Sequence, residues 1–112
     1  MNKPRYYLIL LCITLLVGVL VDYTHTTEHE LIHAKIFRDY GINSTININL
    51  FGTSTTIPDN NTYSNCNTNC KLANEQNEIV GYNFAMLFQI TYVIIIASLL
   101  GQYYKARGKV KP

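Results

Sequence analysis

Two histidines and a glutamate form the pattern with the clearest chemistry, at His29, Glu30 and His33 in the sequence HELIH. On a helix, the two imidazoles lie one turn apart on the same side, where both can bind one zinc ion. The glutamate between them can then act as general base on water, which is the chemistry of metal-assisted hydrolysis. The alternative interpretation is a solvated helix face, on which Glu28 and Glu30 lie near Lys35.

Two apolar blocks enclose this motif and must help to position it, because the segment between them is too short for a robust core of its own. The first block runs over residues 6–21 (YYLILLCITLLVGVLV) and the second over 84–104 (FAMLFQITYVIIIASLLGQYY). Each approaches the roughly 20 apolar residues that a membrane-spanning helix needs. We therefore predict spans at 6–23 and 84–104. The alternative for the first block is a cleaved signal peptide, although no small-residue cleavage pattern follows it.

The distribution of charge predicts the orientation of these spans. Six of the nine basic residues flank the two blocks, whereas the segment between the blocks holds all seven acidic residues and three basic ones, a net charge of −4 with neutral histidines. By the positive-inside rule, residues 1–5 and the basic tail 105–112 are cytoplasmic and residues 24–83 are extracytoplasmic. We expect the tails to contact membrane lipid, not nucleic acid, since they lack interleaved aromatic residues outside the membrane.

The polar segment predicts three structural elements between the spans. Residues 22–40 contain no proline or glycine and extend the first helix, with Gly41 as the residue that follows its end. Residues 46–50 alternate between apolar and polar side chains, and Phe51-Gly52 and a threonine-rich run to Ile57 follow them, which predicts a β-hairpin over residues 44–57. The second helix then begins near Cys70, capped by Thr68 or Asn69. The predicted fold is a single unit, mainly α, with two long antiparallel helices that span the membrane and extend outside it.

The second helix can supply a third metal ligand at the level of the histidines. At a rise of 1.5 Å per residue, His29 and His33 lie about 10 to 17 Å above the first span. By the same measure, Glu78 and Glu75 lie about 9 to 14 Å above the second span. Because these heights overlap, either carboxylate can complete a site with two imidazoles.

The order of these residues resembles that of the gluzincin metalloproteases, in which a glutamate on a later helix follows the two histidines. The resemblance covers HELIH and NEIVGY, about a tenth of the chain. It implies zinc as cofactor, Glu30 as general base and Glu78 as third ligand beside His29 and His33, with Glu75 as the alternative. Where the family has an acidic residue four positions after its ligand glutamate, this chain has Tyr82.

Two further side chains are candidates for stabilising a transition state. Tyr82 or His25 can donate a hydrogen bond to an oxyanion, although a tyrosine near a membrane also serves as an interface anchor.

The longer pattern HExxHxxIFxxYGI, followed by CxxxCxLAxxxNEIVGY, resembles a group of short two-span membrane proteins associated with archaea and their mobile elements. That resemblance implies that the motif, the cysteine pair and Glu78 belong together, and it implies no substrate.

The cysteines and sequons of the polar segment agree with an exterior location. Cys66 and Cys70 are predicted to form a disulfide, and metal binding by this pair is the alternative. Asn43 and Asn60 each begin an Asn-x-Ser/Thr sequon, which is an acceptor site for glycosylation in exported proteins.

Two classes of function follow from these patterns. The first is a membrane-anchored zinc metallopeptidase that acts on peptides or proteins at the outer membrane surface, with a strand at residues 46–50 holding an extended substrate. The second is a noncatalytic membrane protein, either with a structural zinc site closed by a fourth ligand such as His25, or as an accessory subunit. Small residues at Gly18 and Gly101 allow a homo-oligomer through the spans.

Overall fold

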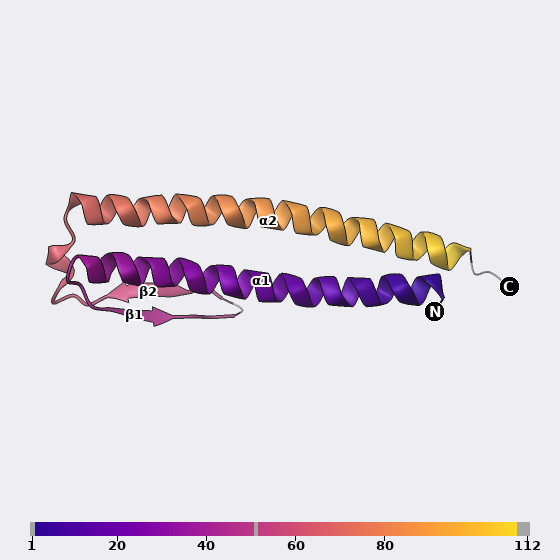
Figure 1. The fold of residues 1–112 in the computed structure, drawn as a ribbon, viewed down its shortest axis with the longest axis horizontal. Helices are drawn as coiled ribbons and strands as arrows, with labels where there is room; N and C mark the ends of the chain where they lie inside the picture. The colour runs from indigo at the N-terminus through magenta and orange to yellow at the C-terminus, as the bar shows by residue number, and fades with distance from the viewer. Residues whose placement is uncertain (1, 51, 110–112) are drawn as a thin grey trace. The chain divides into compact units, whose positions relative to one another are not determined.

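A computed structural model describes residues 2–50 and 52–109, and the chain is mainly helical. Figure 1 shows two long helices joined by a small antiparallel hairpin and a short 3-10 turn. The predicted fold class is confirmed, whereas Lys111 of the predicted tail lies outside the described residues. The elements in chain order are α1 (Lys3–Asp39), β1 (Ser44–Asn47), β2 (Thr55–Pro58), η1 (Tyr63–Asn65) and α2 (Thr68–Gly108).

The chain divides into two compact units, each containing part of both helices. We name residues 2–21 with 85–109 the apolar unit, and residues 22–84 the polar unit. The apolar windows of α1 and α2 are long and apolar enough to cross a membrane, and almost none of their side chains is buried within the protein. Exposed apolar surfaces of this kind are typical of segments that contact a membrane or another protein.

Within the apolar unit, the ring of Tyr92 on α2 lies against Gly18 on α1. A Cβ atom at Gly18 would come within 2.4 Å of this ring, so only glycine allows the contact. The Tyr92 hydroxyl donates to the carbonyl oxygens of Thr14 at 3.3 Å and Leu15 at 3.4 Å. The fit of the Tyr92 ring against Gly18 and the hydrogen bonds of its hydroxyl thus join the two helix segments of this unit.

Helix α1 ends where the sequence predicts. Gly41 has a φ of +72°, the left-handed conformation that glycine adopts most readily after a helix. The next residue, Ile42, donates its backbone N–H to the Phe37 carbonyl at 2.9 Å. This turn places Ile42 in a buried cluster with Phe37, Cys66 and Cys70, against which Ile36 and Tyr40 also pack.

Helix α2 begins slightly earlier than predicted, and its cap is a different residue. The Asn67 side chain accepts a hydrogen bond from the Cys70 backbone N–H at 3.0 Å, so the predicted cap at Thr68 or Asn69 is wrong. The reason is geometric, because a capping side chain bonds the N–H two or three residues further on. With Thr68 already helical, Asn67 is the residue that can reach Cys70.

The hairpin is confirmed, with Ile46 of β1 opposite Thr56 of β2. Both of these side chains are half-buried, whereas Ile57 on the other face is exposed. Strand β1 is shorter than the predicted run to Leu50, since it ends at Asn47.

Candidate metal centre

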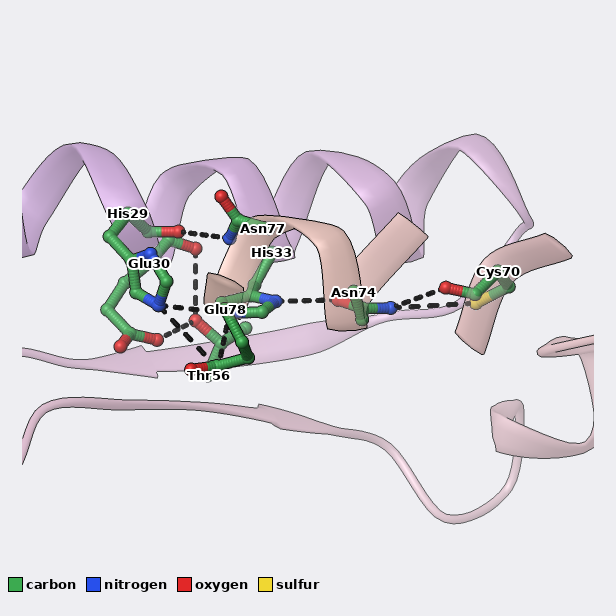
Figure 2. Close-up of polar contacts among 8 residues, drawn as sticks. All are labelled: His29, Glu30, His33, Thr56, Cys70, Asn74, Asn77 and Glu78. Carbon is green, nitrogen blue, oxygen red and sulfur yellow. Dashed lines mark hydrogen bonds and ion pairs between the residues drawn. The ribbon is translucent and has the colours of Figure 1, made fainter. Parts of the chain in front are cut away.

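The three predicted ligands meet within the polar unit. Helix α1 carries both histidines and α2 carries the glutamate (Figure 2). His33 Nε2 lies 2.9 Å from Glu78 Oε1 and 3.2 Å from His29 Nε2, and His29 Nε2 lies 3.6 Å from the same carboxylate oxygen. The group could hold a metal ion.

These separations fit a tetrahedral zinc ion. Bonds of about 2.0–2.1 Å to tetrahedral zinc place neighbouring ligand atoms about 3.3–3.4 Å apart, close to the three separations in this group. The donor set, two imidazole nitrogens and one carboxylate oxygen, is also one that zinc uses in proteins. The histidine side chains are largely buried, whereas the Glu78 side chain is 46% exposed, so the group is accessible from the Glu78 side.

A neighbouring asparagine determines which nitrogen of His33 can bind metal. His33 Nδ1 lies 2.6 Å from the side-chain oxygen of Asn74, which can only accept, so Nδ1 carries the proton and donates it. The lone pair of Nε2 then faces Glu78 Oε1, itself an acceptor when ionised. Two acceptors at 2.9 Å repel unless a cation, either a proton or a metal ion, lies between them.

Helix α2 also supports His29, in two ways. The Asn77 side chain donates to the backbone carbonyl of His29 at 3.2 Å, which ties the helices together beside the ligands. Gly81 leaves room for the imidazole, because a Cβ atom there would lie 2.6 Å from His29 Nδ1. The glycine therefore allows the His29 ring to lie directly against the backbone of α2.

Glu30, the predicted general base, is held by the hairpin. It is only 6% exposed, and Thr56 Oγ1 lies 2.6 Å from its carboxylate oxygen and 3.0 Å from its backbone carbonyl (Figure 2). Glu30 follows His29 on α1 and is not a member of the three-ligand group. This arrangement is consistent with a role other than metal binding.

The other predicted site residues lie outside the ligand group. Glu75 is exposed and contributes no ligand atom, so the geometry favours Glu78 over this alternative. His25 stacks on Phe84 with ring centroids 4.2 Å apart, and Tyr82 is 71% exposed. Among the residues that the structure describes, no fourth histidine, cysteine, aspartate or glutamate joins the group.

The predicted disulfide between Cys66 and Cys70 is present, so these cysteines are not free to bind metal. Asn43 and Asn60 are both exposed, which keeps their sequons accessible.

The sequence interpretation missed four supporting residues: Thr56, Asn74, Asn77 and Gly81. Three of them lie on α2, and their spacing carries a signal that could have identified them. Asn74, Asn77, Glu78 and Gly81 recur at helical intervals of three and four, which puts them on one side of the helix with the ligand. Thr56 has no such signal, because its contact depends on how the hairpin packs on α1.

Comparison of the chain with protein-family models, with curated proteins and with solved structures found no match.

Proposed function

We propose that this chain is a membrane-anchored zinc metallopeptidase that cleaves peptides or proteins at the outer membrane surface. The observation that carries the proposal is the three-ligand group of His29, His33 and Glu78, with Glu30 buried at the position that follows His29 on the same helix. Catalytic zinc sites typically have three protein ligands and keep a fourth position for water or substrate, whereas structural sites are closed by a fourth ligand. The order of the residues also matches the gluzincin arrangement.

The roles of the side chains follow from their positions. A zinc ion in this group would act as a Lewis acid and lower the pKa of its water toward neutrality. Glu30 would accept a proton from the attacking water and return it to the leaving amine. Thr56 would hold the Glu30 carboxylate in place, and the exposed side of Glu78 would leave room for substrate.

The membrane anchor is proposed from the apolar unit and from the distribution of charge. Both helices are long and apolar enough to span a membrane, and basic residues flank the two apolar blocks. With both termini in the cytoplasm, a tag at either end should resist protease in intact cells, and a tag inserted at Asn60 should be cut.

The decisive experiment on catalysis compares Glu30→Gln with the wild type and with Glu28→Gln, an exposed neighbour on the same helix. Each protein is purified with its zinc content measured, and hydrolysis of a quenched-fluorescent peptide library is followed. Glu30→Gln should retain zinc and lose activity by at least about 100-fold, the usual contribution of a general base. Glu28→Gln should behave as wild type.

A structural zinc clip is the second candidate, and one observation favours it. The ligands come from both helices, so a bound ion would cross-link α1 and α2 as a disulfide does. In addition, the Glu30 carboxylate already accepts a hydrogen bond from Thr56. For a clip, removal of zinc should lower the unfolding temperature of the polar unit. Wild-type protein that holds zinc and cleaves no peptide in the library would favour this candidate over the peptidase.

A further inference from the structure

We propose that Asn74 is a positioning residue that couples the Cys66–Cys70 disulfide to the metal-binding atom of His33. In consequence, disulfide formation and metal binding strengthen each other. The inference rests on the metal site of the proposed function and does not depend on hydrolysis. Its basis is a chain of contacts from Cys70 through Asn74 to His33, which Figure 2 shows.

The contact between Asn74 and His33 selects the tautomer that can bind metal. The Asn74 oxygen accepts from His33 Nδ1 at 2.6 Å, which leaves the Nε2 lone pair free to point at His29 and Glu78. It also fixes the rotation of the ring. Partners of this kind orient metal-binding imidazoles, and their loss typically weakens metal binding by about 10- to 100-fold.

The contacts between Asn74 and Cys70 determine which way the asparagine amide faces. Its nitrogen donates to the Cys70 carbonyl at 3.0 Å and lies 3.8 Å from the Cys70 sulfur. If the amide rotated by half a turn, its NH2 group would face the protonated Nδ1 of His33, where two donors would repel. Cys70 therefore keeps the accepting oxygen of Asn74 directed at the histidine.

The disulfide in turn fixes Cys70. The side chain of Cys70, in the first turn of α2, is fully buried in the cluster with Phe37 and Ile42, and its sulfur is bonded to Cys66, which precedes the helix. The first turn of a helix frays readily unless it is held. Without the disulfide, the turn that carries the Cys70 carbonyl is less ordered, and the amide of Asn74 loses part of its support.

Two substitutions at Asn74 separate its contact with His33 from its contact with Cys70. Asn74→Asp keeps an oxygen that accepts from His33 Nδ1 but removes the amide donor to Cys70. Asn74→Leu removes both and has a similar volume. Asn83→Leu is the matched control, since Asn83 is an exposed asparagine of the same helix.

The experiment measures zinc dissociation constants of the full-length protein in detergent by competition with a chromophoric chelator. Each protein is prepared with the disulfide and again with the double substitution Cys66→Ser and Cys70→Ser. In the wild type, loss of the disulfide should weaken zinc binding by about tenfold, the lower end of the range for an orienting partner. Asn74→Leu should weaken binding by about 10- to 100-fold, with no further loss when the disulfide is removed.

Asn74→Asp is the decisive variant. It should bind zinc at least as tightly as wild type, and its affinity should no longer depend on the disulfide. In the metal-free protein, ¹⁵N NMR of His33 should show the Nδ1-protonated tautomer for wild type and Asn74→Asp, and a mixture for Asn74→Leu. A residue that served only the fold would not give this pattern.

Thermodynamic linkage requires that bound zinc favour the disulfide by the same factor by which the disulfide favours zinc binding. In a glutathione buffer, two glutathione thiols reduce the disulfide to two cysteine thiols and form one glutathione disulfide. A tenfold effect on zinc binding means that zinc should lower the midpoint potential of this reaction by about 30 mV. A rise of the midpoint in zinc, or an equal disulfide effect in wild type and Asn74→Asp, would overturn the inference. Wild-type protein that binds no zinc would instead overturn the proposed function.

Discussion

The apolar unit and the polar unit hold their helix segments together by different means. In the apolar unit, the Tyr92 ring fits against Gly18, and most apolar side chains face outward. In the polar unit, directional contacts between α1 and α2 gather at the ligand group, next to a disulfide and a small buried cluster. The contact in the apolar unit thus combines shape with a single donating hydroxyl, whereas a site for chemistry needs each polar group to have a partner.

Metal affinity is the property that depends on the polar unit, and the stability of the helix pair is the property that depends on the apolar unit. The difference between the units predicts that a substitution in one of them leaves the property of the other unchanged. The largest effect should come from the ligand that contacts both others.

His33→Ala should abolish stoichiometric zinc binding. Its Nε2 lies nearest to both other ligand atoms, and one ligand of a protein zinc site accounts for roughly 3–4 kcal/mol, or about 100- to 1,000-fold in affinity. Zinc content after dialysis and the dissociation constant measure the effect. His25→Ala is the control, since His25 stacks on Phe84 outside the group, and an equal loss in this control would remove His33 from its assigned role.

Gly81→Ala should weaken zinc binding by about 10- to 100-fold, the range for groups that orient a ligand. The new methyl group would lie 2.6 Å from His29 Nδ1, so the ring must turn away from Glu78. Gly101→Ala is the matched control, because a Cβ atom at Gly101 meets nothing within 4 Å. Unchanged zinc affinity in Gly81→Ala would show that the ring of His29 does not need this space.

Gly18→Ala should lower the stability of the protein by about 1–3 kcal/mol, because the methyl group overlaps the Tyr92 ring. Zinc affinity should stay within about twofold of wild type, since the ligands lie in the other unit. Thermal unfolding in detergent and the zinc dissociation constant test the two statements together. A large loss of zinc affinity would show that the units are not separable in this way.

The sequence predicted those features that depend on local spacing. Two histidines one turn apart, a glutamate at matching height and a glycine after a helix are each set by helical geometry, and the structure places His29, His33, Glu78 and Gly41 accordingly. Such features need only the rise and turn of one element.

The features that the sequence did not predict depend on contacts between elements. Asn74 and Asn77 belong to a chain rich in asparagine, so residue type alone did not distinguish them from loop formers. The role of Gly81 became visible only from the position of His29, and that of Thr56 only from the packing of the hairpin on α1. A helical projection of residues 70–81 would have indicated Asn74, Asn77 and Gly81.

X-ray absorption at the zinc edge of protein purified without chelators tests the proposed centre most directly. We expect one zinc ion per chain, bound by two imidazoles and at least one oxygen at about 2.0–2.1 Å, with no sulfur ligand. Glu78→Gln should lower zinc occupancy, and Glu75→Gln should leave it unchanged. Protein without stoichiometric metal, or a zinc–sulfur distance of about 2.3 Å, would contradict the assignment of His29, His33 and Glu78 as the ligands.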